Sequence, residues 1–289
     1  MSNSIHETKT HGQLTFPYII YRGNIPKYLS SYPLHWHEEF EIVYIVKGKG
    51  LISIQSQNYV CTDRDILLIS PGQIHSFSQY EDAQMEYFNL LFRFSLLEEN
   101  INAICYQKYL LSILNGQKRI PSYLPSSSPL NQQLTPYLTF LIANRKRSYT
   151  DFELLIKSNL YAILHYIKET ASSATSETLN QLDSINKMKP VLEYVHQNYS
   201  YEMTVKKAAS IAGFSESHFM KVFKTVTGKR FTQYVTLYRL EVAARELRDS
   251  NQKIIEIAEN VGFHNLSYFI RTFTKRYGIS PSAYRSNRL

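Results

Sequence analysis

The chain lacks the sequence features that are typical of secreted proteins and of membrane-spanning proteins. Only 2 of its 289 residues are cysteine, which argues against a disulfide scaffold. No apolar run approaches the roughly 18 to 20 residues that a bilayer-spanning helix needs. The first residues, MSNSIHETKTHGQ, lack the apolar segment of a secretion signal. These absences predict a cytoplasmic protein with no membrane partner.

Acidic residues are scarce in the last third of the chain. From Ile185 onward, 17 lysines and arginines stand against 8 aspartates and glutamates, a balance of +9. Residues 1–184 contain 15 lysines and arginines and 16 aspartates and glutamates, a balance of −1. All the excess positive charge therefore lies in the C-terminal region. A localised basic region of this kind supplies the salt-sensitive part of affinity for DNA phosphates.

The same region contains a near-repeat. The segment AGFSESHFMKVFKTVTG, residues 212–228, returns as VGFHNLSYFIRTFTKRYG, residues 261–278. The Gly-Phe pair at the start of each copy recurs after 49 residues. The later phenylalanines, Phe223 and Phe273, and the closing glycines, Gly228 and Gly278, recur after 50 residues, so the second copy has one added residue just before its helix. Apolar residues four apart share one helical face. Each copy therefore predicts a helix, a glycine turn and a second helix, with Ala209 and Ala258 at the helix crossing.

This helix-turn-helix pattern places the second helix of each copy in a DNA major groove. After the apolar positions are assigned to the core, the remaining face carries the residues that we expect to contact bases. Arg271 is the best single candidate, because its guanidinium can bond guanine O6 and N7 together, whereas Lys221 is geometrically less defined. The alternative is an ordinary solvated helix face. The predicted base-contacting residues are Ser217, Met220, Lys221, Leu266, Ser267, Ile270 and Arg271.

Other basic and polar residues near the helix ends and turns suit phosphate contacts, which set register without reading sequence. The predicted phosphate-contacting residues are Lys206, Lys224, Lys229, Arg230, Thr274, Lys275 and Arg276.

The segment IAENVGFHNLSYFIRTFTKRYGISPSAYR, residues 257–285, resembles the signature of the AraC/XylS family of bacterial transcription regulators. The preceding YVTLYRLEVAAREL resembles the helix that joins the two subdomains in that family. The resemblance covers about 100 residues. It implies seven helices forming two helix-turn-helix units, which lie in successive major grooves of promoter DNA. The first unit departs from the family pattern at Ser217 and Phe219, which makes its base readout less defined.

The N-terminal part has a different composition. Between Phe16 and Phe94, short runs rich in Ile, Val, Tyr and Phe are broken by Gly, Pro, Asn and Asp, as in all-β sandwiches and barrels. HWHEEFEIVYIVKGKG and ISPGQIHSF resemble the cupin-like effector domain common in the same family. The expected fold class is therefore α+β in two domains: a cupin-like β-barrel with a helical connector, and an all-α double helix-turn-helix domain.

The barrel supports two interpretations. His35, His37, Glu41 and His75 follow the ligand order of metallocupins, and imidazole with carboxylate suits iron, manganese, nickel or zinc. The simpler interpretation, which we prefer, needs no metal or other cofactor and makes the barrel a polar, aromatic-lined pocket for a sugar. We expect His37, Glu39 and Glu41 to share one strand face, with Trp36 either in the pocket or in the core. The candidate effector-binding residues are His35, His37, Glu39, Glu41, Tyr44, His75, Tyr87 and Arg93.

The segment DFELLIKSNLYAILHYIKET predicts a helix with one wide apolar stripe, which could pack on its own barrel or, as we favour, pair across a dimer. PSYLPSSSP reads as a loop, and ASSATSETLNQLDS as a flexible linker. The expected domains are 1–100, the effector barrel; 101–170, a helical connector and dimerisation region; 171–184, the linker; and 185–289, the DNA-binding domain.

These features together predict a non-enzymatic transcription regulator, an activator by analogy with the family. Its expected partners are double-stranded promoter DNA, a small-molecule effector such as a sugar, RNA polymerase and a second copy of the chain. One rival is a metallocupin enzyme or metal sensor fused to DNA-binding helices, which a stoichiometric metal would favour. Another is a constitutive architectural DNA binder, which would show little sequence preference.

Overall fold

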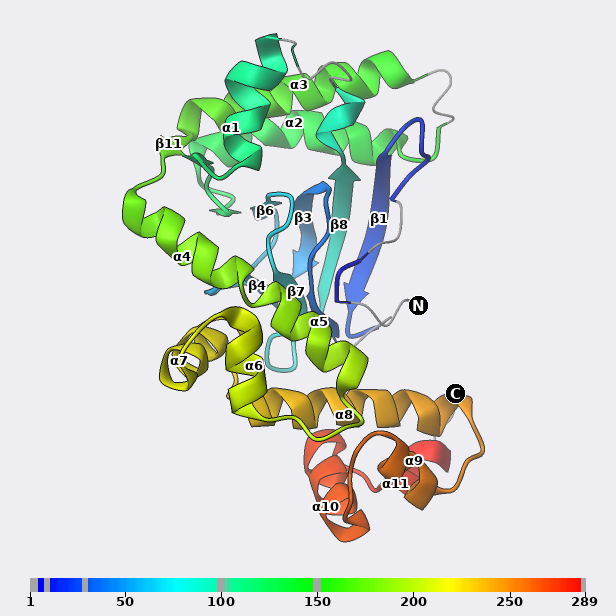
Figure 1. Cartoon of the computed structure of the whole chain (residues 1–289). Coiled ribbons are helices and arrows are strands. Elements are labelled where there is room, and N and C mark those ends of the chain that lie inside the picture. Colours follow the sequence, from blue (N-terminus) through cyan, green and yellow to red (C-terminus); the bar gives the residue numbers. More distant parts are fainter. Residues whose placement is uncertain are drawn as a thin grey trace. The chain divides into compact units, whose positions relative to one another are not determined.

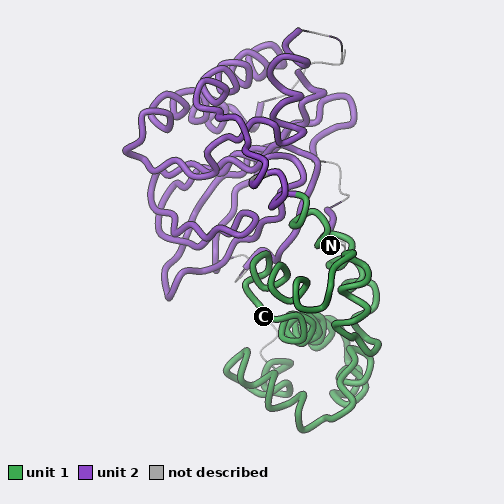
Figure 2. The backbone as a smooth tube through the Cα atoms, turned by 60° about the vertical axis from the view of Figure 1, so that its left-hand side comes forward, with its two compact units in different colours: residues 1, 3–5, 183–289 green, residues 2, 6–182 purple. Residues whose placement is uncertain are grey.

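The computed structural model describes residues 5–7, 11–27, 31–97, 102, 104–147 and 152–286 (Figure 1). The chain divides into two compact units, which are mainly residues 6–182 and residues 183–289 (Figure 2). Within the described ranges, no helix combines the length and apolarity needed to cross a bilayer.

The first unit contains two antiparallel sheets that together form a flattened barrel. The five-stranded sheet has the order β1-β8-β3-β6-β10 and the four-stranded sheet the order β2-β7-β4-β5. The strands are β1 Tyr18–Ile25, β2 Ser31–His35, β3 Phe40–Gly48, β4 Gly50–Ile54, β5 Gln57–Cys61, β6 Ile66–Ile69, β7 His75–Gln79, β8 Met85–Phe92 and β10 Tyr123–Leu124.

Strand β3 shows why the sequence of this barrel is so apolar. Its odd-numbered residues Val43 and Ile45 join a core shared by both sheets, together with Ile52 and Phe77 of the other sheet. Its even-numbered residues, such as Ile42, join a second core that includes two helices. Because both faces are covered, FEIVYIV is a nearly continuous apolar run, not an alternating one.

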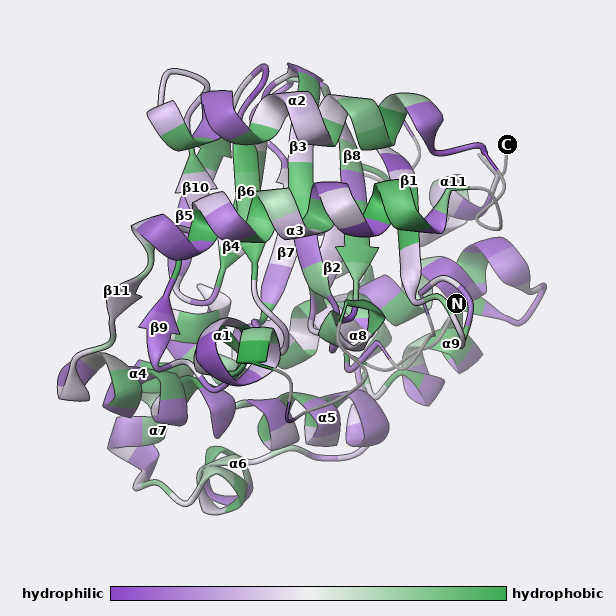
Figure 3. Cartoon of the chain, turned by 90° about the horizontal axis from the view of Figure 1, so that it is seen from above, coloured by the Kyte–Doolittle hydropathy of each residue, from purple (hydrophilic) through white to green (hydrophobic). Residues whose placement is uncertain are grey.

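Helices α2 (Pro129–Asn144) and α3 (Glu153–Thr170) cover the outer face of the five-stranded sheet (Figure 3). Ile156, Leu160 and Ile163 of the predicted apolar stripe are buried in this core. Most of the stripe therefore packs within its own chain and does not form the dimer contact that we favour, whereas Leu155 is 47% exposed. The physical reason is that the apolar outer face of the sheet must also be shielded from water.

The segment between the barrel and the second unit is more ordered than its sequence suggests. The predicted loop 121–129 contains β10, which pairs with β6, and its Pro129 begins α2. The predicted flexible linker 171–184 contains β11 (Ser172–Ser173) and most of α4 (Ser176–Asn186), in which leucines recur three residues apart. The remaining elements here are η1 Phe94–Leu96, η2 Tyr106–Leu110, α1 Leu111–Leu114 and β9 Lys118–Arg119, which pairs with β11.

Seven helices from α5 to α11 form most of the second unit, as the family resemblance implies. They are α5 Lys189–Asn198, α6 Val205–Ala212, α7 Glu216–Thr227, α8 Phe231–Asp249, α9 Ile254–Asn260, α10 Leu266–Tyr277 and α11 Pro281–Ser286. The long helix α8 contacts α7 on one side and α9 and α11 on the other. It thus joins the two helix-turn-helix units, α6–α7 and α9–α10.

The two turns confirm the near-repeat and identify its extra residue. The N–H of Phe214 donates to the carbonyl of Ala209, and that of Phe263 to the carbonyl of Ala258. The second helix then begins after the capping residue Ser215 in one copy, but after Asn265 in the other. The added residue is therefore His264, between Phe263 and Asn265. Both alanines are buried, as expected at a close helix crossing.

Candidate effector pocket and nucleic-acid interface

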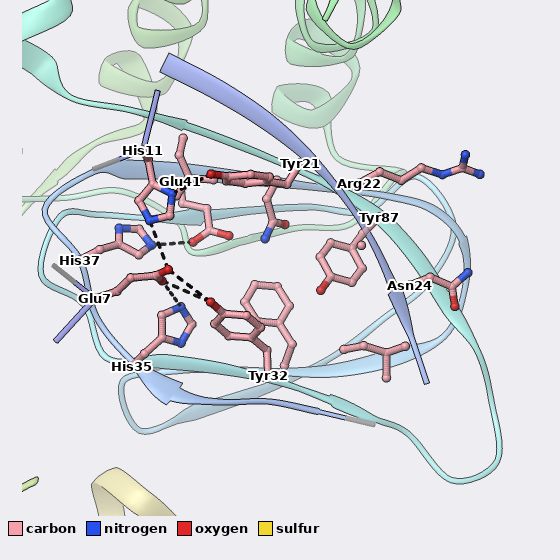
Figure 4. A pocket seen from close by; sticks show the side chains of 15 residues that line it. Glu7, His11, Tyr21, Arg22, Asn24, Tyr32, His35, His37, Glu41 and Tyr87 are labelled. Atoms are coloured by element: carbon pink, nitrogen blue, oxygen red, sulfur yellow. Dashed lines mark hydrogen bonds and ion pairs between the residues drawn. The ribbon is translucent and has the colours of Figure 1, made fainter. Parts of the chain in front are cut away.

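The barrel contains a partly open cavity of about 250 Å³, lined by charged, polar and aromatic side chains (Figure 4). Its walls come from β1, β2, β3, β7 and β8, so both sheets contribute, and from two residues of the N-terminal segment. The lining residues are Glu7, His11, Tyr21, Arg22, Gly23, Asn24, Ile25, Tyr32, His35, His37, Glu41, Phe77, Tyr87, Asn89 and Leu91.

The motif HWHEEFE brings three chemically active side chains to one end of this cavity. We expected His37, Glu39 and Glu41 to share a strand, but β2 ends at His35 and β3 begins at Phe40. The chain therefore crosses from one sheet to the other within the motif. Because of this crossing, His35 and Glu41 approach the cavity from opposite sheets, and His37 lies between the two strands.

A buried ion-pair network connects these residues. His37 Nε2 donates a hydrogen bond of 3.0 Å to Glu41 Oε2. Burial opposes the charged form of Glu41, but the hydrogen bond from His37 and the proximity of His75 outweigh it and hold the pKa of the carboxyl below its usual range. Burial also opposes protonation of His37, yet its bond to Glu41 raises the pKa of the imidazole. Burial lowers the pKa of His35 to about 3, so His35 is neutral at physiological pH.

The other end of the cavity is lined by aromatic rings and by side-chain oxygens that can accept hydrogen bonds. Tyr87 stacks on Phe77 with ring centroids 5.3 Å apart. Gly23 on the neighbouring strand leaves room for Tyr87, because a Cβ atom at position 23 would overlap the tyrosine ring. The side-chain oxygens of Asn24 and Asn89 are buried without a hydrogen-bond partner in the described part of the chain. A bound molecule with hydroxyl or amine donors could satisfy them.

Four of the eight predicted effector residues line the cavity: His35, His37, Glu41 and Tyr87. His75 is fully buried beside it, with Nε2 3.1 Å from Glu41 Oε2.

The three remaining predicted effector residues, Glu39, Arg93 and Tyr44, do not line the cavity. Glu39 is buried against Arg93, whose Nε donates to Glu39 Oε1 at 2.9 Å. Tyr44 packs against the core under α2 and α3, because the alternation of β3 turns it away from the cavity. Trp36, for which we left two roles open, is a buried residue stacked on His6 and does not line the pocket.

Sequence reasoning missed the contribution of the N-terminal segment. Tyr32 donates to both carboxylate oxygens of Glu7 at 3.4 Å, and His11 Nδ1 lies 3.3 Å from the hydroxyl of Tyr21. Burial opposes the ionised form of Glu7, but the proximity of His11, whose Nε2 lies 3.5 Å from Glu7 Oε1, outweighs it and lowers the pKa of the carboxyl. The only available signal was two histidines and a glutamate within a short polar stretch, which has no fixed spacing to any strand.

The second unit presents two matching exposed faces. Four positions of α7 correspond to positions of α10 that are 50 residues later: Ser217 with Ser267, Met220 with Ile270, Lys221 with Arg271, and Lys224 with Thr274. All are exposed except Thr274, which is half-buried, as is the predicted base-contacting Leu266. Met220 is 49% and Ile270 39% exposed. Both copies thus expose a large apolar side chain at the same helix position.

The remaining face of each helix fixes its orientation. Phe219 and Phe223 of α7, and Phe269 and Phe273 of α10, are fully buried. The side chains of Ser215 and Asn265 cap the N-termini by accepting from the N–H groups of His218 and Tyr268. The predicted phosphate-contacting residues Lys206, Lys229, Arg230, Lys275 and Arg276 are exposed around these helices.

Two family models match the chain. A model described as an AraC-like ligand binding domain matches residues 21–164, and one described as a helix-turn-helix domain matches residues 208–287. An uncharacterized HTH-type transcriptional regulator of Bacillus subtilis, YdeC, is 24% identical over 99% of this chain and 97% of its own length. The HTH-type transcriptional activator RhaR of Mannheimia succiniciproducens is 24% identical over 90% of this chain and 89% of its own.

Among solved structures, the C-terminal domain of the response regulator yesN from Fusobacterium nucleatum is 31% identical. The matched region spans 35% of this chain and 98% of the chain of that structure, with a TM-score of 0.33. The two family models each match one of the two folded units. The first covers most of the two sheets and of helices α2 and α3, and the second covers most of the paired helix-turn-helix units. The chain belongs to the AraC family of DNA-binding transcriptional regulators with an N-terminal ligand-binding domain.

Proposed function

We propose that this protein activates transcription from specific promoters when a small sugar occupies the barrel. The observation that carries the proposal is the pairing of two features in one chain. One is the polar cavity in the first unit, and the other is the pair of matching exposed faces on α7 and α10.

On the DNA side, we assign the matched positions of α7 and α10 to base contacts. Arg271 would read a guanine through two hydrogen bonds, and Met220 and Ile270 would contact apolar groups of base edges such as thymine methyls. The exposed lysines and arginines around the helix ends would bind phosphates, which supports affinity on any sequence.

On the effector side, the cavity favours a monosaccharide over a larger ligand. Its volume of about 250 Å³ lies below the range of roughly 300 to 1,000 Å³ usual for drug-sized ligands. Carboxylates, tyrosine hydroxyls and the unpartnered oxygens of Asn24 and Asn89 are acceptors for the many hydroxyls of a sugar. Tyr87 and Phe77 offer an aromatic surface for its apolar face.

The sugar must bind one arrangement of the two units more tightly than another, because a ligand with equal affinity for both states shifts nothing. We propose that the protein acts in the cytoplasm as a homodimer on paired sites and contacts RNA polymerase. Leu154, which is 84% exposed, and Leu155, which is 47% exposed, lie on α3 and provide apolar surface for a dimer. The relative named an activator supports activation, and the regulator names of the relatives support a non-enzymatic role.

A thermal-shift screen of the full-length protein against neutral monosaccharides tests the effector half of the proposal. A sugar at about one hundred times its Kd should stabilise the barrel by about 2.7 kcal/mol. Footprinting on the chain's own upstream region, with and without the sugar found, tests the DNA half. Sugar binding that leaves DNA occupancy and transcription unchanged would contradict regulation by the sugar. A ratio near one between the affinities for the target site and for unrelated DNA would indicate an architectural protein.

A further inference from the structure

A tyrosine in the first turn of α10 lies beside the arginine that we assign to base reading. Tyr268 is 45% exposed, and Arg271 follows it by three residues on the same helical face. The Cζ atom of Arg271 lies 5.7 Å from the centroid of the Tyr268 ring. A guanidinium within about 6 Å of a ring centroid is attracted to the face of the ring. The two side chains therefore form a cation–π pair on the surface of α10.

The surrounding structure holds Tyr268 in a fixed place. Its N–H donates to the capping side chain of Asn265 at 2.8 Å, and its carbonyl accepts from the hydroxyl of Thr272 at 2.7 Å. Its ring lies next to that of Phe263, with centroids 6.0 Å apart. Phe263 is buried and lies against Phe269, with centroids 5.2 Å apart. The exposed tyrosine ring thus rests on the buried core of the second helix-turn-helix unit.

The direction of the Arg271 side chain follows from the same helix. Side chains of an α-helix lean toward its N-terminus, over the preceding turn. For Arg271 that turn carries Tyr268, so the guanidinium is directed toward the ring. The sequence of α10, LSYFIRTFTKRY, contains no aspartate or glutamate that would draw the guanidinium elsewhere along the helix. The ring therefore restricts a side chain that otherwise has many rotamers.

The first helix-turn-helix unit has a ring but no guanidinium at the matching positions. His218 stands 50 residues before Tyr268, and Lys221 stands 50 residues before Arg271. The His218 ring lies beside that of Phe214, with centroids 4.4 Å apart, so a supported ring is present in both copies. A guanidinium is planar and stacks on an aromatic face, whereas an ammonium is a point charge with rotating donors. A neighbouring ring can therefore orient the donors of the arginine but not those of the lysine.

We infer that Tyr268 is a positioning residue, which holds the guanidinium of Arg271 in the orientation for a bidentate contact to guanine. The inference rests on the proposed base readout by Arg271 and names the residue that makes this readout selective. A bidentate contact requires the guanidinium to align with O6 and N7 of one base. A side chain that is already restricted loses less conformational entropy when it binds. A neutral ring adds no charge that attracts phosphates, so Tyr268 acts on discrimination between bases and not on general affinity.

The test uses the full-length protein and the duplex DNA that it selects from a random-sequence pool. Arg271→Ala first identifies the base pair that Arg271 reads, as the position at which discrimination is lost. Tyr268→Leu should lower discrimination at that base pair about two- to fivefold, the size of an exposed cation–π interaction. Tyr268→Phe keeps the ring and should discriminate as the wild type does. Tyr268→Leu added to Arg271→Ala should cause no further loss there, because the pair is already broken.

The near-repeat supplies a matched control. His218→Leu removes the corresponding ring of α7 and should leave discrimination at the base pair of Arg271 unchanged. NMR of the Arg271 Nε–H group in the unaltered, DNA-free protein covers the case in which a variant fails to fold. This group should show a ring-current shift and restricted motion, and Tyr268→Phe should retain both. An Arg271 group with the mobility of an isolated surface side chain overturns the inference.

The DNA measurements separate failure of the inference from failure of the proposed function. Weakening by Tyr268→Leu that is equal on all sequences overturns the inference, because the ring would then serve general affinity or folding. Equal loss of discrimination in Tyr268→Phe and Tyr268→Leu also overturns it, since the hydroxyl would then carry the effect. A wild-type protein that selects no sequence, or an Arg271→Ala variant that discriminates as the wild type does, contradicts the proposed base readout and the inference with it.

Discussion

Gly262, in the turn of the second helix-turn-helix unit, lies directly against the guanidinium of Arg239 on α8. A Cβ atom at position 262 would lie 2.9 Å from Arg239 Cζ and 2.8 Å from the carbonyl oxygen of Ser200. Arg239 itself donates to the carbonyls of Tyr199 and Tyr201, at 2.7 and 2.8 Å. One arginine of α8 thus connects the loop before α6 with the turn between α9 and α10.

The near-repeat supplies a matched pair of substitutions for this contact. Gly213 and Gly262 both have positive φ, but a Cβ atom at Gly213 would meet nothing within 4 Å. Gly213→Ala should therefore cost only backbone strain, roughly 1 to 2 kcal/mol. Gly262→Ala adds a steric overlap and should cost on the order of 3 kcal/mol or more. Chemical denaturation of the two variants measures the difference, and equal losses would contradict a close packing of Gly262 on Arg239.

Arg271→Ala should change sequence discrimination more than general affinity. We expect a loss of about 1 to 3 kcal/mol at one base pair, because a bidentate contact to guanine disappears. Lys275→Ala is the control. Loss of its phosphate contact should weaken binding about equally on all sequences and should lower, by about one, the slope of the logarithm of the binding constant against the logarithm of the salt concentration. Binding titrations against a set of single-base variants of the target site measure both. Uniform weakening by Arg271→Ala would assign Arg271 to phosphate instead.

Gly23→Ala should damage the effector pocket while leaving the barrel folded. The added methyl group overlaps the ring of Tyr87 and pushes it from its stacked position on Phe77. We expect the affinity for the sugar identified by screening to fall about tenfold or more, equivalent to about 1.4 kcal/mol. Tyr87→Phe keeps the ring and should have a smaller effect. Calorimetric titration compares the variants, and unchanged affinity in Gly23→Ala would remove Tyr87 from the binding site.

Glu241 on α8 should make the DNA-binding unit less stable at higher pH. Burial raises the pKa of this carboxyl, although Arg276, Arg245 and Lys229 act in the opposite direction. The folded state therefore binds a proton more tightly than the unfolded state, and stability falls as pH rises above the unfolded pKa of about 4.3.

Glu241→Gln removes the charge whose burial causes this loss. Its Tm should exceed that of the wild type by an amount that grows as pH rises through the folded pKa and then levels off. Glu202→Gln, at an exposed position, gives the effect of removing a surface carboxylate. Thermal melts across this pH range measure the gain. A gain in Tm for Glu241→Gln that grows toward low pH would reverse the assigned direction of the shift.

The family, the fold class and the paired helix-turn-helix units could be predicted because their signals are local. Phenylalanines four residues apart, a turn glycine and a capping serine or asparagine act within one or two helical turns. Even the single added residue in the second copy was visible from the spacing, and the structure identifies it as His264.

The pocket could be predicted only in part because its members meet through the tertiary fold. The motif HWHEEFE predicts one strand, but the chain leaves one sheet at His35 and enters the other at Phe40. The sequence pattern predicts Tyr44 in the cavity, although the pleat of β3 turns it toward the helices. Glu7 and His11 carried no periodic signal that could connect them to the barrel.

The sequence by itself thus determined the two kinds of unit, the exposed faces of α7 and α10 and the basic charge around them. These follow from periodicity and composition, which act over a few residues. Only the tertiary structure decided which side chains share the cavity and that α3 covers its own sheet. It also decided that His35, His37 and His75 lie close together and that two of them, His37 and His75, contact Glu41. Such contacts join residues far apart in the chain, and their formation depends on how two sheets and two helices bury their apolar faces together.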